Sequence, residues 1–113
     1  MRVEEALRSK RIVNLCVNAQ RRVCITVFRG VERDYVLNES MCSCPDYIIN
    51  VVGRGRARPC YHIIALRRAV ELGKVIEVFV DPGTFEDIVF EIVNDGFSRT
   101  LRLVIQGLDS LKE

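Results

Sequence analysis

The sequence predicts an α+β fold: a three-stranded antiparallel β-meander and a helix, followed by a C-terminal strand and two further helices. Apolar and polar residues alternate between residues 12 and 37, which is typical of half-buried strands. After residue 59, apolar residues recur every three or four positions, which is typical of helices. A length of 113 residues with 49% hydrophobic and 28% charged side chains predicts one folded domain over residues 1–113.

A short amphipathic helix is expected over residues 3–9, followed by a β-hairpin. The apolar residues of the two hairpin strands can be set opposite each other in one register: Val13 with Val27, Leu15 with Ile25, and Val17 with Val23. This register leaves residues 19–21 as the loop.

The same register places Cys16 opposite Cys24. We expect two small, half-buried hydrophobic side chains, because free cysteine is among the most buried residue types. The alternative is a cross-strand disulfide, which intracellular proteins of hyperthermophiles do form. A disulfide requires a Cα separation below about 7 Å.

A third strand is expected after Gly30, where Arg33, Tyr35 and Leu37 continue the alternation. The apolar residues 48–52 fit either a short strand or a single helical turn. A helix is then expected from Pro59 to near Gly73, because proline loses no hydrogen bond in the first turn. Its predicted apolar face consists of Ile63, Ile64, Leu66 and Val70, with Arg67 and Glu71 four residues apart on the solvent side.

The C-terminal part is expected to form a strand over residues 75–80 and two helices that pack back on the sheet. The first helix would begin with a capping box made by Thr84 and Asp87 and end at Gly96. The second would begin at Ser98 as N-cap. Its predicted apolar stripe is Leu101, Val104, Leu108 and Leu111.

Two ligand pairs, a Cys-x-Cys and a Cys-x-His that contains the chain's single histidine, predict a structural zinc site made by Cys42, Cys44, Cys60 and His62. Structural zinc takes four such ligands in a tetrahedron, which leaves no open position for catalysis. The alternative is a set of buried cysteines and a core histidine. We expect about one zinc per chain and unfolding on chelation, because binding energy at such sites is folding energy.

These residues resemble the SWIM-type zinc finger, whose pattern is C-x-C, a variable gap and C-x-H. The hairpin before Cys42, the helix after His62 and an aromatic residue soon after the second cysteine, Tyr47, agree with that pattern over roughly residues 23–70. The chain is similar to a small, stand-alone, archaeal-like member, with a zinc-binding core of about residues 23–72 and a C-terminal extension of residues 74–113. The resemblance implies a nucleic-acid-binding or protein-binding module, and it does not imply an enzyme.

The formal net charge of +2 does not by itself indicate a nucleic-acid-binding protein, but basic residues gather between residues 53 and 74, where Glu71 is the single acid. We expect DNA or RNA to be bound by Arg54, Arg56, Arg58, Arg67, Arg68 and Lys74. The alternative is a solvated loop that balances the zinc thiolates. Tyr47 and Tyr61 stack on bases in the first interpretation and pack around the metal in the second.

The alternative function is a protein–protein adaptor, such as a recombination mediator that partners a recombinase paralogue through the helices between residues 85 and 111. That apolar stripe is equally typical of a core. An enzyme is not expected, because the histidine is assigned to metal and neither a nucleophile–base pair nor a phosphate-binding glycine loop is present. No apolar run approaches 20 residues and no export signal is visible, so we expect a cytoplasmic protein with no membrane or small-molecule partner.

Overall fold

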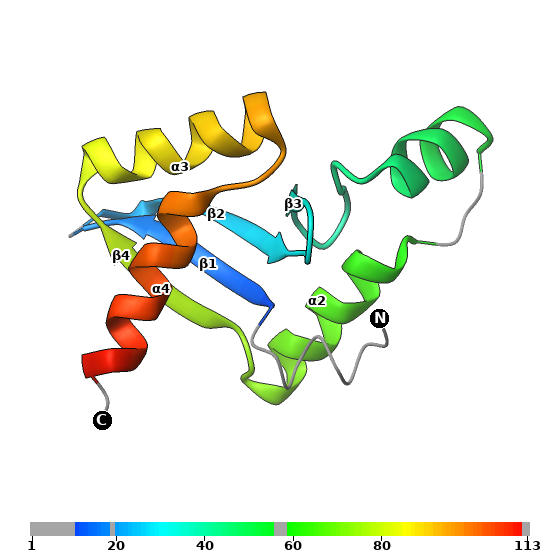
Figure 1. Ribbon diagram of the computed structural model, residues 1–113. Helices are drawn as coiled ribbons and strands as arrows, with labels where there is room; N and C mark the ends of the chain where they lie inside the picture. Colours follow the sequence, from blue (N-terminus) through cyan, green and yellow to red (C-terminus); the bar gives the residue numbers. More distant parts are fainter. Residues whose placement is uncertain (1–10, 19, 56–58, 112–113) are drawn as a thin grey trace.

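The computed structural model describes residues 11–18, 20–55 and 59–111, and its fold is α+β as predicted (Figure 1). The helix expected over residues 3–9 lies outside this part of the chain. No helix in the described part is long and apolar enough to cross a membrane. In chain order the elements are β1 (Ile12–Val17), β2 (Gln20–Arg29), β3 (Asp34–Leu37), the π-helix η1 (Tyr47–Gly53), α2 (Tyr61–Leu72), β4 (Ile76–Val80), α3 (Pro82–Asp95) and α4 (Arg99–Leu111).

The strands form one mixed sheet in the order β3-β2-β1-β4. Strands β1, β2 and β3 make the predicted antiparallel meander, and β4 adds to the free edge of β1 in parallel orientation. Val13 pairs with Val27 as predicted, but Val17 pairs with Gln20 instead of Val23. The predicted loop over residues 19–21 is therefore wrong at its end, since the register shifts after Cys16 and β2 already begins at Gln20.

Cys16 and Cys24 lie opposite each other as predicted, and a disulfide joins them across a Cα separation of 4.1 Å. The expectation of two free thiols was wrong. Directly opposed residues on antiparallel strands bring their Cβ atoms within about 4.5–5.5 Å, which suits a bridge as well as two packed thiols. Burial propensity alone does not separate these two outcomes.

Alternating side chains of β1, β2 and β3 enter two different cores, one on each face of the sheet, whereas β4 contributes only to the core on the α3 side. The core on the α2 side contains Ile12, Phe28 and Leu37 together with Cys42, Cys44, Cys60, Ile63, Ala65, Leu66 and Ala69. The core on the opposite face contains Val13, Leu15, Val27, Val78, Val80, Ile88, Ile92, Leu101 and Ile105. Helices α3 and α4 therefore pack on the sheet as predicted, and the metal-ligand cysteines belong to the other side.

Helix α2 begins at Tyr61 with Cys60 as N-cap, and it ends at Gly73, which adopts the left-handed conformation at φ 65° that glycine favours. Its buried face consists of Ile63, Ala65, Leu66 and Ala69. The predicted face was partly wrong, because Ile64 and Val70 are exposed. Two alanines allow close packing on that side, so the buried stripe is rotated from the one that side-chain size predicts.

The other helix ends also differ in part from the predictions. The N-cap of α3 is Asp81, whose carboxylate accepts a hydrogen bond from the Thr84 backbone N–H at 3.1 Å, so the predicted cap at Thr84 was wrong. Ser98 caps α4 as predicted, because its Oγ accepts from the Leu101 N–H at 3.0 Å. The undecided residues 48–52 lie in η1, which buries none of its side chains.

A buried ion pair ties α4 to the turn between β2 and β3. The Asp34 carboxylate, whose side chain is fully buried, accepts hydrogen bonds from both terminal nitrogens of Arg102 at 2.6 and 2.7 Å. It also accepts from the Ser98 N–H at 2.7 Å, and Arg102 donates to the Gly30 carbonyl at 2.9 Å. The C-terminal extension therefore holds the end of the meander that lies beside the metal cluster.

Candidate metal centre

Two structural elements bring the four predicted ligands together. Cys42 follows β3 and bridges back to Leu37, and Cys44 stands three residues before η1. Cys60 is the N-cap of α2, and His62 lies in the first turn of that helix. Each Cys-x-Cys or Cys-x-His pair thus comes from one side of the loop over residues 45–59.

Each of these residues offers one ligand atom, and the four atoms all lie within 4.8 Å of one another. In a tetrahedral site with Zn–S bonds of about 2.3 Å, neighbouring sulfurs are about 3.8 Å apart, so this cluster is of the right size. Cys42, Cys44 and Cys60 are buried. The cluster could therefore hold a metal ion such as zinc.

The imidazole of His62 gives an independent indication that the cluster suits a metal ion. The Nδ1 atom of His62 is buried and has no hydrogen-bond partner among the described residues. A buried polar atom without a partner is costly in free energy, and a metal–nitrogen bond would remove that cost. The Sγ atom of Cys44 meanwhile accepts a hydrogen bond from the Tyr47 N–H at 3.3 Å, which would favour a thiolate.

Burial controls the protonation of the cluster. It raises the pKa of Cys42, and the neighbouring thiols of Cys44 and Cys60 raise it further. Burial also raises the pKa of Cys44. It lowers the pKa of His62, an effect that the Asp46 carboxylate partly opposes. These shifts favour protonated Cys42 and Cys44 thiols and a neutral imidazole at neutral pH, and a bound cation would displace the thiol protons.

Aromatic rings surround the imidazole on several sides. The centroid of the His62 ring lies 4.5 Å from that of Phe28, 4.7 Å from that of Tyr35 and 4.9 Å from that of Tyr61. These contacts fix the orientation of the ring. Tyr47 is half-buried, and its hydroxyl donates a hydrogen bond to the Ser40 carbonyl at 3.0 Å. This agrees with the interpretation in which Tyr47 packs around the metal cluster rather than stacking on a base.

The six basic residues predicted to bind nucleic acid do not form one continuous patch in the described part of the chain. Arg54 is exposed at the end of η1, whereas Arg56 and Arg58 lie outside the described residues. Lys74 follows the far end of α2, which a helix of 12 residues places about 18 Å from its start. The basic character of this segment is therefore spread along α2.

Arg67 and Arg68 are neighbours in sequence and point to different partners. Arg67 donates to the Glu39 carbonyl at 2.9 Å, which ties α2 to the segment before Cys42. Arg68 pairs with Glu71 at 3.3 Å, in place of the pair predicted between Arg67 and Glu71. Successive helical residues project about 100° apart, so Arg67 and Arg68 lie on different sides of α2.

Sequence reasoning missed a hollow beside the cluster. It has a volume of about 400 Å³, and its lining includes Phe28, Tyr35, Tyr61 and His62. Tyr35 was predicted only as a strand residue. The available signal was that Phe28 and Tyr35 pair directly across β2 and β3, which places their rings on one face of the sheet.

Comparison with known proteins assigns no family. No family model matches the chain, and no solved structure matches it. A stretch of 43 residues is 40% identical to an uncharacterized protein of Archaeoglobus fulgidus. That stretch is 38% of this chain and 35% of the archaeal protein, so the chain spans about a third of the length of this relative.

Proposed function

We propose that this chain is a structural-zinc module of the SWIM type that binds nucleic acid, DNA or RNA, through the loop between its two ligand pairs. The observation that carries the proposal is the convergence of the four ligand atoms within 4.8 Å, because an ion bound there would hold both ends of that loop in place. Cys44 stands at one end and Cys60 at the other. A loop so anchored presents its arginines to a partner at a reduced cost in conformational entropy.

Zinc has a structural role in this proposal, and the module is not an enzyme. Cys42, Cys44, Cys60 and His62 would hold the ion, which when bound would supply a cross-link between the end of β3 and the start of α2. Four protein ligands leave no coordination position for water or a substrate. We therefore expect no metal-dependent hydrolysis.

The charge of the loop supports a phosphate partner. The Arg54 side chain is exposed, and no hydrogen bond or ion pair engages it among the described residues. Gly55 and Ala57 separate it in sequence from Arg56 and Arg58. Small residues between arginines leave the guanidinium groups room to contact successive phosphates, an interaction that depends on salt concentration rather than on base sequence.

The proposal is tested by binding to single- and double-stranded DNA and to RNA over a series of salt concentrations. Replacing Arg54, Arg56 and Arg58 together by alanine should weaken binding and make the slope of log K against log salt shallower, by up to about 2.7 for duplex DNA. Arg99→Ala is the control, because Arg99 is exposed at the start of α4 and is not among the residues predicted to bind nucleic acid. An unchanged slope in the triple variant would refute phosphate binding by the loop.

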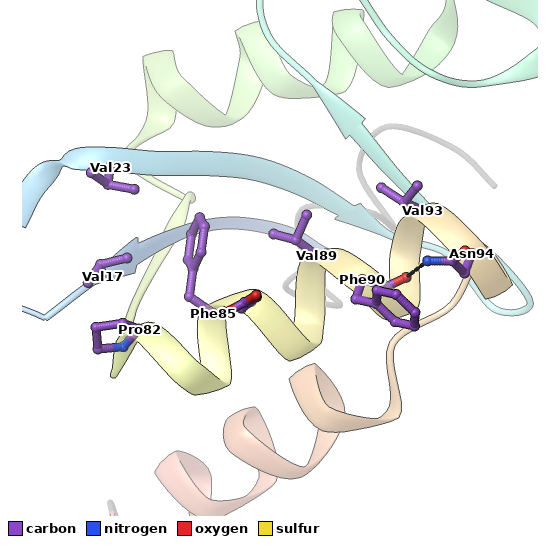
Figure 2. A pocket seen from close by; sticks show the side chains of 9 residues that line it. Val17, Val23, Pro82, Phe85, Val89, Phe90, Val93 and Asn94 are labelled. Atoms are coloured by element: carbon purple, nitrogen blue, oxygen red, sulfur yellow. Dashed lines mark hydrogen bonds between the residues drawn. The ribbon is translucent and has the colours of Figure 1, made fainter.

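A second candidate function, the protein–protein adaptor, is favoured by an apolar groove along α3. Figure 2 shows Phe85, Val89 and Val93 pointing from α3 toward the side of β1 and β2, where Val17 and Val23 complete the lining of a hollow of about 620 Å³. Phe90 is 66% exposed and Val93 is 73% exposed, which is unusual for side chains of this size. Such a groove fits an apolar segment of a protein partner.

The adaptor proposal is tested with a purified recombinase paralogue from the same genome. The double substitution Phe90→Ser and Val93→Ser should abolish co-elution of the two proteins. Leu103→Ser is the control, because Leu103 is 67% exposed on α4 and does not line the groove. Equal loss in both variants, or no complex with the unaltered chain, would refute the groove as the docking site for this partner.

A further inference from the structure

The hollow beside His62 combines aromatic rings from three elements. Phe28 in β2 and Tyr35 in β3 are paired across the sheet, and Tyr61 comes from the first turn of α2. Phe28 is buried, but Tyr35 and Tyr61 are only half-buried, so part of each tyrosine remains open to solvent. The turn between β2 and β3, with Gly30 and Arg33, closes the hollow on the remaining side.

Positive charge gathers around this turn. Arg11 donates to the carbonyls of Arg29 and Gly30 at 3.1 and 3.3 Å, and its Nε atom is buried without a hydrogen-bond partner among the described residues. Of the charged residues that line the hollow, Glu32 and Arg33 balance each other, and Arg102 is already paired with the Asp34 carboxylate. The guanidinium group of Arg11, which reaches the Gly30 carbonyl of the hollow, therefore adds one positive charge beside the turn, and this charge favours an anionic ligand.

We propose that this hollow takes one unpaired nucleobase of a DNA or RNA strand, which would make the module selective for single-stranded over duplex nucleic acid. The inference rests on the proposed nucleic-acid binding and identifies where its base contact lies. Aromatic side chains stack on bases of any sequence, because every base has a π-face. In a duplex these faces are stacked on one another and are not accessible to a side chain.

The same residues argue against other ligands of an aromatic pocket. A cation such as a methylated lysine is attracted by ring faces, but here it would be repelled by the guanidinium group of Arg11 beside the hollow. A nucleotide supplies a flat π-face for the rings, polar base edges and a phosphate. Tyr61, which lines the hollow, follows Arg58 of the basic loop by only three residues in the chain. The proposed base contact and the proposed phosphate contacts therefore come from neighbouring parts of the sequence.

The affinity test compares a fluorescently labelled single strand, as DNA and as RNA, with a duplex of the same sequence. Tyr35→Leu and Tyr61→Leu should each weaken single-strand binding by about tenfold, within the range reported for loss of one stacking ring, and change duplex binding by less than about twofold. Tyr47→Leu is the matched control. Tyr47 packs in the same core as Tyr35 and Tyr61 but does not line the hollow. Zinc content and circular dichroism confirm that each variant folds.

A second measurement needs no substitution that threatens the fold. The chain has three tyrosines, so incorporation of 3-fluorotyrosine yields three ¹⁹F resonances that single Tyr→Phe variants assign. On addition of the single strand, the resonances of Tyr35 and Tyr61 should shift and that of Tyr47 should not. Equal effects with DNA and RNA strands would mean recognition of the base alone, and a stronger effect with RNA would add a contact to the 2′-hydroxyl.

The outcomes separate this inference from the proposed function. If the unaltered protein binds nucleic acid with a salt-dependent affinity that the loop arginines control, but no pocket tyrosine resonance shifts, then the pocket inference is overturned and the proposed function stands. If the unaltered protein prefers duplex over single strand, the pocket inference is likewise overturned. If it binds neither, both fail.

Discussion

Removal of the metal should unfold the α2 side of the molecule and leave the opposite face more nearly intact. Three of the ligands, Cys42, Cys44 and Cys60, are themselves members of the core that joins α2 to the sheet. The core on the α3 side contains none of the ligands. The effect of chelation is therefore expected to be local in the structure.

The energies involved make this loss large. Structural zinc contributes an apparent binding free energy of about 10–16 kcal/mol at neutral pH. A domain of 113 residues has a total stability of roughly 6–17 kcal/mol at about 0.05–0.15 kcal/mol per residue. Loss of the ion removes an amount comparable to the whole stability, and the core that holds the buried face of α2 to the sheet is the one that contains three of the ligands.

The assay is hydrogen exchange followed by mass spectrometry, with and without a chelator that removes the zinc completely. Backbone amides from Ile64 to Ala69 should lose their protection, whereas those of β1, β4 and α3 should keep more of theirs. The disulfide between Cys16 and Cys24 supports this difference, because it holds β1 to β2 without any metal. Cys60→Ala should reproduce the effect of the chelator.

Ser43→Ala is the control for a local disturbance of the ligand turn. Ser43 stands between two ligands, is exposed, and accepts a hydrogen bond from the Val36 N–H at 3.0 Å, so its loss should cost about 1 kcal/mol and leave zinc bound. If α2 keeps its full protection in protein shown by elemental analysis to contain no metal, the assignment of a structural zinc is refuted.

Three further predictions follow from buried groups. Arg102→Met leaves the buried Asp34 carboxylate without its cation, so it should lower the free energy of unfolding of the zinc-loaded protein by about 3–5 kcal/mol in urea titrations. Adding Asp34→Asn should restore part of that loss, and a loss below about 1 kcal/mol in the single variant would contradict the prediction. Because burial raises the pKa of Cys42 and Cys44 above the ordinary 9.0, zinc must displace at least two protons at pH 7–8. Its apparent association constant should therefore fall by at least about 100-fold per unit decrease in pH, and a flat profile in chelator competition would contradict this. Cys24→Ser opens a disulfide that spans 8 residues and should cost about 2–3 kcal/mol, measured against unaltered protein with and without reductant; a variant as stable as the oxidised protein would count against the bridge.

The parts of the fold that depend on local pattern were predictable. Side-chain alternation fixes which residues face each other in a hairpin, so the pairings of Val13 with Val27 and of Leu15 with Ile25 were predicted correctly. The pairing of Val17 was predicted incorrectly, because the chain directly after β1 also forms a hydrogen bond to β4. The Asn18 N–H donates to the Val80 carbonyl at 2.7 Å, a contact between segments that are more than 60 residues apart.

The helix caps illustrate the same limit. Thr84 and Asp87 fit the spacing of a capping box, but Asp81 is a stronger N-cap and stands directly before Pro82, which suits the first helical position. Local sequence contained the correct answer there. The buried face of α2 was not available locally, because the side of the helix that contacts the sheet depends on where β1 and β2 lie.

The metal cluster was predictable, whereas the surface around it was not. Cysteine and histidine in paired spacing specify their own chemistry, so Cys60 and His62 could be placed at one centre from the sequence. A surface patch depends on where each long side chain points. Arg67 and Arg68 show this, because one binds a backbone carbonyl near the metal cluster and the other an acid on its own helix.

The two proposed functions make use of opposite faces of the sheet, and this makes them separable by experiment. Tyr35 belongs to the face that carries the metal cluster and α2, whereas Phe85 of the groove packs on the face that carries α3 and α4. A partner protein in the groove would therefore leave the aromatic hollow open to a strand. Phe90→Ser should not change nucleic-acid affinity, and Tyr35→Leu should not change protein binding. If either substitution impaired both activities in folded, zinc-loaded protein, the two faces would have to communicate through the sheet, and the assignment of one partner to each face would be wrong.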